Sequence, residues 1–150
     1  MLFRSTYEPI YTVYLQYPRA VKLPQVMIGL TQMTSQWIFD RGQLNGQKGL
    51  LAVIISANGK HQKLSQEALA NKVISELKSA FSNLPSPKWY KVIAEKRATF
   101  ACTANLERPQ QKTGIQNLYL AGDYTEGNYP ATIEGAIQSG LSAAQLILQS

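Results

Sequence analysis

NLYLAGDYTEGNYPATIEGAIQSGLSAAQLIL, residues 117–148, is the most informative stretch of the chain. Its apolar start at 118–121 predicts a short strand that ends at the Gly-Asp pair 122–123. A polar loop follows. Pro130 predicts the first position of a helix that runs to about Leu148, because proline fits there without losing a needed amide. The stretch therefore predicts a strand, a loop and a helix in succession, as in an α/β domain.

The predicted helix has one face of small side chains. Ala131, Gly135, Ser139 and Ala143 recur at every fourth position, and this spacing places them in one row. Glycines inside a helix cost roughly 1 kcal/mol each relative to alanine. We therefore expect a close neighbour on this face, either the sheet of an α/β core or a flat ligand.

The end of the strand and the start of the helix together predict a ligand site. The first helical amides, from Ala131 to Glu134, lack partners within the helix and carry the positive end of its dipole. Asp123 lies where the strand releases the chain, which is where open α/β sheets bind ligands. Its carboxylate either accepts from ligand hydroxyls or caps its own loop. The residues alone leave both interpretations open.

The first hundred residues predict an antiparallel sheet and one helix, with the strands at 10–15, 26–30 and 36–40 forming a meander because short polar turns separate them. A helix is expected from Ser65, as N-cap, to about Ser82, because apolar residues recur at helical spacing. The fold class expected is α+β, with an antiparallel substrate-domain sheet and helix in 1–105 and a strand-loop-helix segment in 106–150 that returns to an α/β domain. Strands are expected at 10–15, 26–30, 36–40, 50–56 and 88–100, with a glycine turn at 45–49.

The composition limits the classes of function. One cysteine and one histidine argue against a disulfide framework, a metal site and a hydrolytic triad. The net charge is +6, but the basic residues are scattered, so no nucleic-acid partner is predicted. No apolar run reaches the roughly 20 residues of a bilayer-spanning helix. Without a signal peptide at the start, a cytoplasmic location is expected, with peripheral contact at the inner face of the membrane as a second expectation.

Two motifs carry a family resemblance. Residues 117–125 and 129–140 together resemble the C-terminal FAD-binding segment of flavin amine oxidases and carotenoid desaturases. Residues 36–42 (QWIFDRG) and 95–101 (EKRATFA) are most similar to the squalene-associated branch, the hydroxysqualene dehydroxylases. The resemblance implies an FAD-dependent oxidoreductase that acts on a long isoprenoid, converting hydroxysqualene to squalene. A phytoene-type desaturase, a flavin amine oxidase and a non-catalytic remnant or interaction module are the alternatives.

The resemblance also implies roles for particular residues, though no catalytic one. Asp123 would bind the ribityl–pyrophosphate portion of FAD, and the amides around Ile133 would face the N1 and C2 carbonyl of the flavin. The region of Tyr11, Met27, Trp37 and Phe39 would belong to the sheet that walls the isoprenoid cavity. The cofactor-binding residues expected are Gly122, Asp123, Pro130, Ala131, Thr132, Ile133 and Glu134.

One departure from the family pattern concerns the ADP half of FAD. Such enzymes begin with a Gly-x-Gly-x-x-Gly strand-turn-helix, whereas Gly42, Gly46 and Gly49 have a different spacing and precede a predicted strand. We therefore expect this chain to be the C-terminal part of a longer enzyme whose N-terminal FAD-binding portion is its partner. By itself the chain is expected to be inactive and to bind FAD weakly or not at all.

Three further residue groups give weaker signals. His61 follows a glycine turn, which predicts a solvated loop position. Cys102 follows the last predicted strand of the sheet, where buried packing is expected. Asp40 and Arg41 are interpreted as a charge pair at a strand end.

Overall fold

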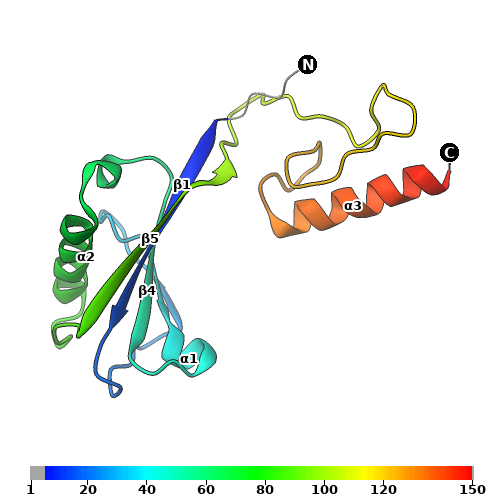
Figure 1. Cartoon of the computed structure of the whole chain (residues 1–150). Coiled ribbons are helices and arrows are strands. Elements are labelled where there is room, and N and C mark those ends of the chain that lie inside the picture. Colours follow the sequence, from blue (N-terminus) through cyan, green and yellow to red (C-terminus); the bar gives the residue numbers. More distant parts are fainter. Residues whose placement is uncertain (1–5, 150) are drawn as a thin grey trace. The chain divides into compact units, whose positions relative to one another are not determined.

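The computed structural model describes residues 6–149, and this part of the chain divides into two compact units (Figure 1). The sheet unit is Glu8–Ala98. The loop–helix unit runs from Thr99 onward and includes the chain before Glu8. The domain boundary expected between residues 105 and 106 stays a prediction.

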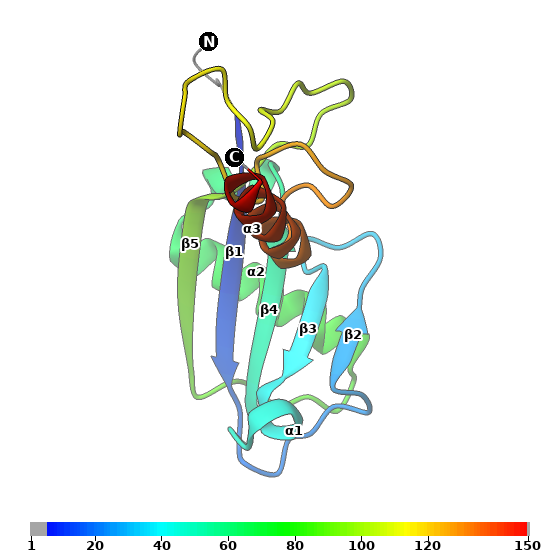
Figure 2. The same ribbon diagram turned by 90° about the vertical axis from the view of Figure 1, so that its right-hand side faces the viewer.

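The sheet unit is built on an antiparallel five-stranded sheet with the order β2-β3-β4-β1-β5 (Figure 2). The expected meander of the first three strands is only partly right: β2 pairs antiparallel with β3, but β1 pairs antiparallel with β4 instead of β2 and places Val13 opposite Val53. Strand β4 also pairs antiparallel with β3. At the end of β1, the Lys88 amide donates to the Gln16 carbonyl at 2.6 Å. The strands are β1 (Tyr7–Gln16), β2 (Met27–Gly29), β3 (Trp37–Asp40), β4 (Leu50–Ser56) and β5 (Trp89–Phe100).

Helix α2 (Gln66–Ala80) covers one face of the sheet and confirms the predicted helix. The Ser65 hydroxyl caps it by accepting from the Ala68 amide at 3.1 Å. Beyond its last residue, Phe81 closes the helix through its amide on the Leu77 carbonyl. Burial of apolar side chains between sheet and helix provides the main stabilisation of this unit. The core contains Val13, Leu15, Ile38, Leu51, Val53, Ile55, Leu69, Val73 and Leu77.

A short helix, α1 (Arg41–Asn45), lies between the strand expected at 36–40 and the glycine turn expected at 45–49, where no helix was predicted. The Asp40 carboxylate accepts from the Gly42 and Gln43 amides and so caps its start. Gly46, with φ of 80°, ends it in the left-handed region that favours glycine. Five residues are too few to show helical periodicity, so only the capping residues signalled this helix. A 3-10 turn, η1 (Lys60–Lys63), follows β4.

The loop–helix unit differs from its prediction in two places. Residues 118–121 form no strand: they make one bridge, Lys112 with Tyr119, and the Leu120 amide donates to the Gln111 carbonyl at 2.8 Å. The expected strand is wrong here because the described chain offers this segment only the irregular connector as a pairing partner. Helix α3 (Ile133–Leu148) begins three residues after Pro130, so proline is not its first position. Among residues 6–149 no helix is long and apolar enough to cross a membrane.

Candidate functional site

The loop at 122–131 folds back on itself and brings Asp123 beside the start of α3. The Ala131 amide donates to the Asp123 carbonyl at 3.2 Å. The buried Thr125 hydroxyl donates to the Gly122 carbonyl at 2.9 Å. Gly122 has φ of 154°, and a Cβ there would lie 2.5 Å from the Tyr124 ring, so only glycine fits. The loop thus holds the acid and the helix start together.

The start of α3 leaves two amides unused. The Thr132 hydroxyl accepts from the Gly135 amide at 3.0 Å and donates to the Tyr129 carbonyl at 2.8 Å. Ala131 precedes this cap with φ of 57°, which is why the helix starts later than predicted. Within the described residues the Ile133 and Glu134 amides have no hydrogen-bond acceptor. Free amides at a helix N-terminus suit an anionic or carbonyl group.

The Asp123 side chain is also available. Its carboxylate is half-buried and accepts no hydrogen bond from any group between residues 6 and 149, so it does not cap its own loop. The Glu134 carboxylate, in contrast, accepts from the Gln138 amide at 2.6 Å. The free carboxylate and the two free amides belong to the same loop–helix junction and offer both acceptors and donors to a ligand. This donor set fits a cofactor that carries hydroxyl and carbonyl groups, as FAD does.

Two side chains of the preceding connector brace the loop. Arg108 donates to the Thr125 carbonyl at 2.7 Å and to the Gly127 carbonyl. Gln111 donates to the Thr125 hydroxyl at 3.2 Å and to the Glu126 carbonyl at 2.8 Å. Sequence reasoning treated this segment as a linker and missed both residues. The connector 106–114 also contains Glu107, Gln110 and Lys112, so its composition does not single out Arg108 and Gln111.

The small face of α3 packs on the same loop. Its two buried residues are Ser139 and Ala143, and the Ser139 hydroxyl accepts from the Gly122 amide at 2.7 Å. A Cβ on Gly135 would lie 2.0 Å from the Tyr129 carbonyl oxygen, so the loop itself requires this glycine. A Cβ on Gly140 would meet nothing within 4 Å. The predicted close neighbour is therefore the loop at Gly135, while Gly140 lies open.

The residues expected in the wall of a substrate cavity lie on two different faces of the sheet. Met27 lies opposite Phe39 on neighbouring strands, and alternation of side chains places Trp37 on the same face. Met27 and Trp37 are exposed by 49% and 44%. Tyr11 instead packs on the core under α2, with its ring 4.9 Å from that of His61. All four residues belong to the sheet, as expected, but Tyr11 lies on the face opposite to that of Met27, Trp37 and Phe39.

The environments predicted for His61 and Cys102 are both wrong. His61 is 7% exposed rather than solvated, and its Nε2 has no hydrogen-bond partner. Burial, aided by the nearby Lys72 charge, lowers the pKa of His61. Cys102 is exposed rather than buried. These two positions depend on how η1 and the end of β5 pack, which the local sequence does not show.

Asp40 has partners other than the expected one. Arg41 donates to Gln47, while the Asp40 carboxylate accepts from the Leu23 amide at 2.9 Å and from the Gln43 side chain at 2.8 Å. Burial would raise the pKa of Asp40, but hydrogen bonds from Leu23, Gln43 and Gly42 outweigh it and leave the pKa lowered. Asp40 is therefore ionised at neutral pH, and its hydrogen bonds hold the Leu23 segment and the start of α1 in place.

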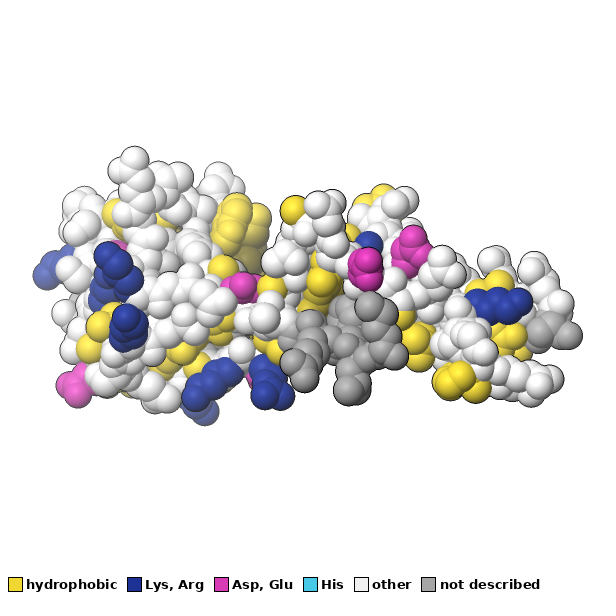
Figure 3. Space-filling view, turned by 90° about the horizontal axis from the view of Figure 1, so that it is seen from above, with side chains coloured by type: hydrophobic (Ala, Val, Ile, Leu, Met, Phe, Trp, Pro, Cys, Tyr) yellow, Lys and Arg dark blue, Asp and Glu magenta, His cyan; other side chains and the backbone are white. Residues whose placement is uncertain are grey.

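Other classes of site have little support in the described chain. Residues 6–149 hold no group of three or more His, Cys, Asp or Glu side chains placed to bind a metal ion. On the face drawn in Figure 3, Lys and Arg side chains form small groups at several places and no single continuous patch. The Asp123 loop with the start of α3 is therefore the candidate functional site of the described chain.

Comparisons with known proteins point to one family. The family model of the flavin-containing amine oxidoreductases matches residues 2–148. A hydroxysqualene dehydroxylase of Zymomonas mobilis is 33% identical over 95% of this chain and 33% of its own length. That of Rhodopseudomonas palustris is 34% identical with the same coverage. A zeta-carotene desaturase of Synechocystis is 36% identical over 69% of this chain and 22% of its own length.

A solved structure shares the fold. A crystal structure described as a protoporphyrinogen oxidase from Exiguobacterium matches with a TM-score of 0.69 at 13% identity. It covers 98% of this chain and 36% of the other. The chain thus spans about a third of the length of the relatives it matches.

Proposed function

The chain belongs to the family of flavin-containing amine oxidoreductases, and from this premise we propose that it is the C-terminal portion of an FAD-dependent enzyme that converts hydroxysqualene to squalene. The similarity to two hydroxysqualene dehydroxylases along 95% of the chain supports this substrate. The desaturase similarity favours carotenoid-type desaturation as the second candidate.

We propose that the Asp123 loop and the start of α3 hold the cofactor. FAD, when bound, supplies the electron transfer. The Asp123 carboxylate accepts from cofactor hydroxyls, and the Ile133 and Glu134 amides donate to a carbonyl group. The dipole of α3 favours negative charge at this point. The observation that carries the proposal is that these groups belong to one junction, which the hydrogen bond from the Ala131 amide to the Asp123 carbonyl closes, and that they lack partners within residues 6–149.

The open face of the sheet is proposed as a wall for the isoprenoid. Met27, Trp37 and Phe39 lie on this face, and Ile54 pairs with Trp37 on it. Helix α2 covers the opposite face, so these apolar side chains are left for another occupant. A long hydrocarbon needs such an extended apolar surface. Because long isoprenoids dissolve in bilayers, the proposal includes peripheral contact with a membrane.

The proposal requires a second portion of polypeptide. Nothing in the sequence matches the glycine motif that holds the ADP half of FAD, and the relatives are about three times longer than the matched region. The nucleotide-binding portion is therefore the proposed partner, and FAD retention by the 150-residue chain alone would contradict this division.

Flavin retention in a reconstituted enzyme tests the site. The chain is co-produced with the nucleotide-binding portion of the Zymomonas relative, and bound flavin is titrated for Asp123→Asn and for the control Glu126→Gln in the same loop. Loss of one charge-assisted hydrogen bond predicts roughly 10- to 100-fold weaker flavin binding for Asp123→Asn alone. Equal retention by both variants would remove Asp123 from the site.

A further inference from the structure

Three connecting segments of the sheet unit carry basic side chains and no acidic ones. They are residues 17–26 after β1, 41–49 between β3 and β4, and 81–88 between α2 and β5. The strand directions bring them to the same end of the sheet, the lower end in Figure 1 and Figure 2. We call these segments the basic end. It contains Arg19, Lys22, Arg41, Lys48 and Lys88, and no Asp or Glu.

Three of these cations surround one hollow. Arg19, Lys22 and Lys48 line a cavity of about 350 Å³. The Tyr17 amide donates to the Gly49 carbonyl at 2.8 Å, which ties the Arg19 and Lys48 segments together. Gly49 has φ of 77°, and a Cβ there would lie 2.6 Å from the carbonyl oxygens of Tyr17 and Pro18. The close approach of the two segments therefore depends on a glycine.

The carboxylate that lines this hollow, that of Asp40, forms no ion pair with the three cations. Asp40 lines the cavity but is only 1% exposed. Its oxygens accept from the Leu23, Gly42 and Gln43 amides and from the Gln43 side chain, so their acceptor capacity is used internally. None of the three cations forms an ion pair with a carboxylate of the described chain. They are consequently available to an external anion.

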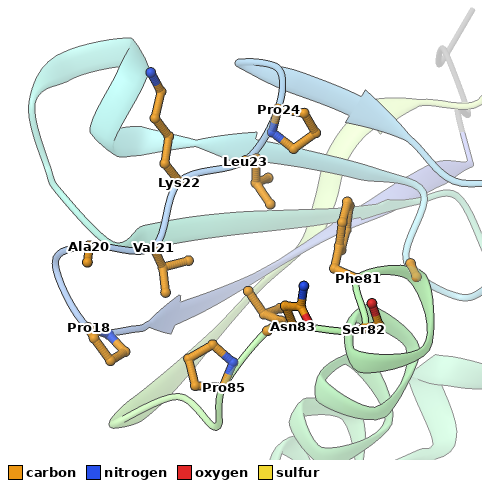
Figure 4. Close-up of a pocket in the computed structure, with 12 residues that line it drawn as sticks. Pro18, Ala20, Val21, Lys22, Leu23, Pro24, Phe81, Ser82, Asn83 and Pro85 are labelled. Atoms are coloured by element: carbon orange, nitrogen blue, oxygen red, sulfur yellow. The ribbon is translucent and has the colours of Figure 1, made fainter.

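Apolar surface adjoins the basic hollow. Figure 4 shows Val21 and Leu23 turned toward the end of α2, while Lys22 between them points the other way. On the Val21 side lies a second hollow of about 680 Å³, lined mainly by apolar side chains. Val26 and Leu44, 39% and 55% exposed, lie in the segments of the basic end. Cationic and apolar groups are thus mixed on one surface.

We propose that the basic end binds the anionic phospholipid headgroups of a membrane surface, with Arg19, Lys22 and Lys48 around the phosphate groups. Charge complementarity selects this occupant, because the segments lack acids and phosphate is a strong acceptor for arginine and lysine. The exposed Val26 and Leu44 suit the boundary between headgroups and acyl chains. The inference rests on the proposed function in one respect: an isoprenoid substrate places the enzyme's work at a bilayer.

Vesicle flotation of the full chain tests this surface without flavin or substrate. Vesicles of phosphatidylcholine with phosphatidylglycerol are compared with phosphatidylcholine alone. The variant Arg19→Gln/Lys22→Gln/Lys48→Gln is matched by Lys60→Gln/Lys63→Gln/Lys96→Gln, which removes the same charge from other parts of the sheet unit. Circular dichroism verifies that both variants fold. Each cation near the surface contributes about fivefold to partitioning, so the first variant should bind anionic vesicles roughly 100-fold more weakly.

The outcomes distinguish the possible sources of the anion. Binding that requires phosphatidylglycerol, falls with added salt and survives in the matched variant supports the proposal. Equal loss in both triple variants would overturn it in favour of a non-specific charge effect. Binding of inorganic phosphate by calorimetry without vesicle binding would overturn it in favour of a small-anion site. Because FAD is not involved, these results stand apart from the flavin-retention experiment.

Discussion

Helices α2 and α3 have nearly the same length, 15 and 16 residues, but opposite relations to their surroundings. Helix α2 buries Leu69, Val73 and Leu77 against the sheet. Helix α3 buries only Ser139 and Ala143, while Ile133 and Leu148 are 82% and 86% exposed. The sheet unit thus covers one face of its sheet with its own helix. The loop–helix unit instead leaves the apolar side chains of α3 exposed.

The largest difference between the units should appear on truncating a helix leucine. Leu77→Ala removes a side chain with 0% exposure and is expected to cost about 2–5 kcal/mol in the free energy of unfolding. Leu141→Ala, at 62% exposure, should change it by less than about 0.5 kcal/mol. Urea unfolding followed by circular dichroism measures both. Similar losses for the two variants would mean that α3 has a covered apolar face.

Alanine substitutions at the two glycines of α3 should change the stability by an intermediate amount. The two positions serve as a matched pair because only one of them is crowded. Gly135→Ala places a Cβ against the Tyr129 carbonyl and should destabilise the loop by about 1–3 kcal/mol through overpacking. Gly140→Ala meets nothing and should stabilise the helix by up to about 1 kcal/mol. Hydrogen exchange across residues 122–131 should quicken in the first variant only. Equal exchange in both would show that the loop does not depend on Gly135.

The smallest effect concerns pH and the buried His61. The pKa of His61 is lowered in the folded chain. As the pH falls, the imidazole is therefore protonated in the unfolded chain at a higher pH than in the folded chain. The stability that this group contributes is therefore complete above the ordinary value of 6.5 and is lost as pH falls through the lowered folded pKa. His61→Leu should flatten this part of the stability-pH curve. Lys72→Gln should flatten it partly, and an unchanged curve in both variants would contradict the assignment.

Prediction from sequence succeeded where a pattern was long and local. Strand β4 and helix α2 follow from the apolar run at 50–56 and the helical spacing after Ser65. It failed where partners outside the segment decide the outcome. Residues 118–121 have the composition of a strand but only an irregular partner, and α1 is defined by its capping residues rather than by periodicity.

The candidate site, too, was predicted from the sequence only where its residues belong to one local motif. The neighbourhood of Asp123 and the helix start could be predicted because both lie within one strand-loop-helix motif. The true helix start could not, since it depends on the left-handed Ala131 and the Thr132 cap. Arg108 and Gln111 reach the loop from the connector. The position of Tyr11 depends on sheet register, because neighbouring residues along a strand face opposite sides.

The sheet order has a consequence for how this gene segment can be handled. The chain enters the sheet unit on β1 and leaves it on β5, and these strands are neighbours. At the border the Ala101 amide donates to the Thr6 carbonyl at 2.8 Å. Entry and exit therefore lie next to each other, as in a cassette inserted into a host domain. We expect that residues 8–98 can accordingly be excised, with a short linker from residue 7 to residue 99 to close the gap.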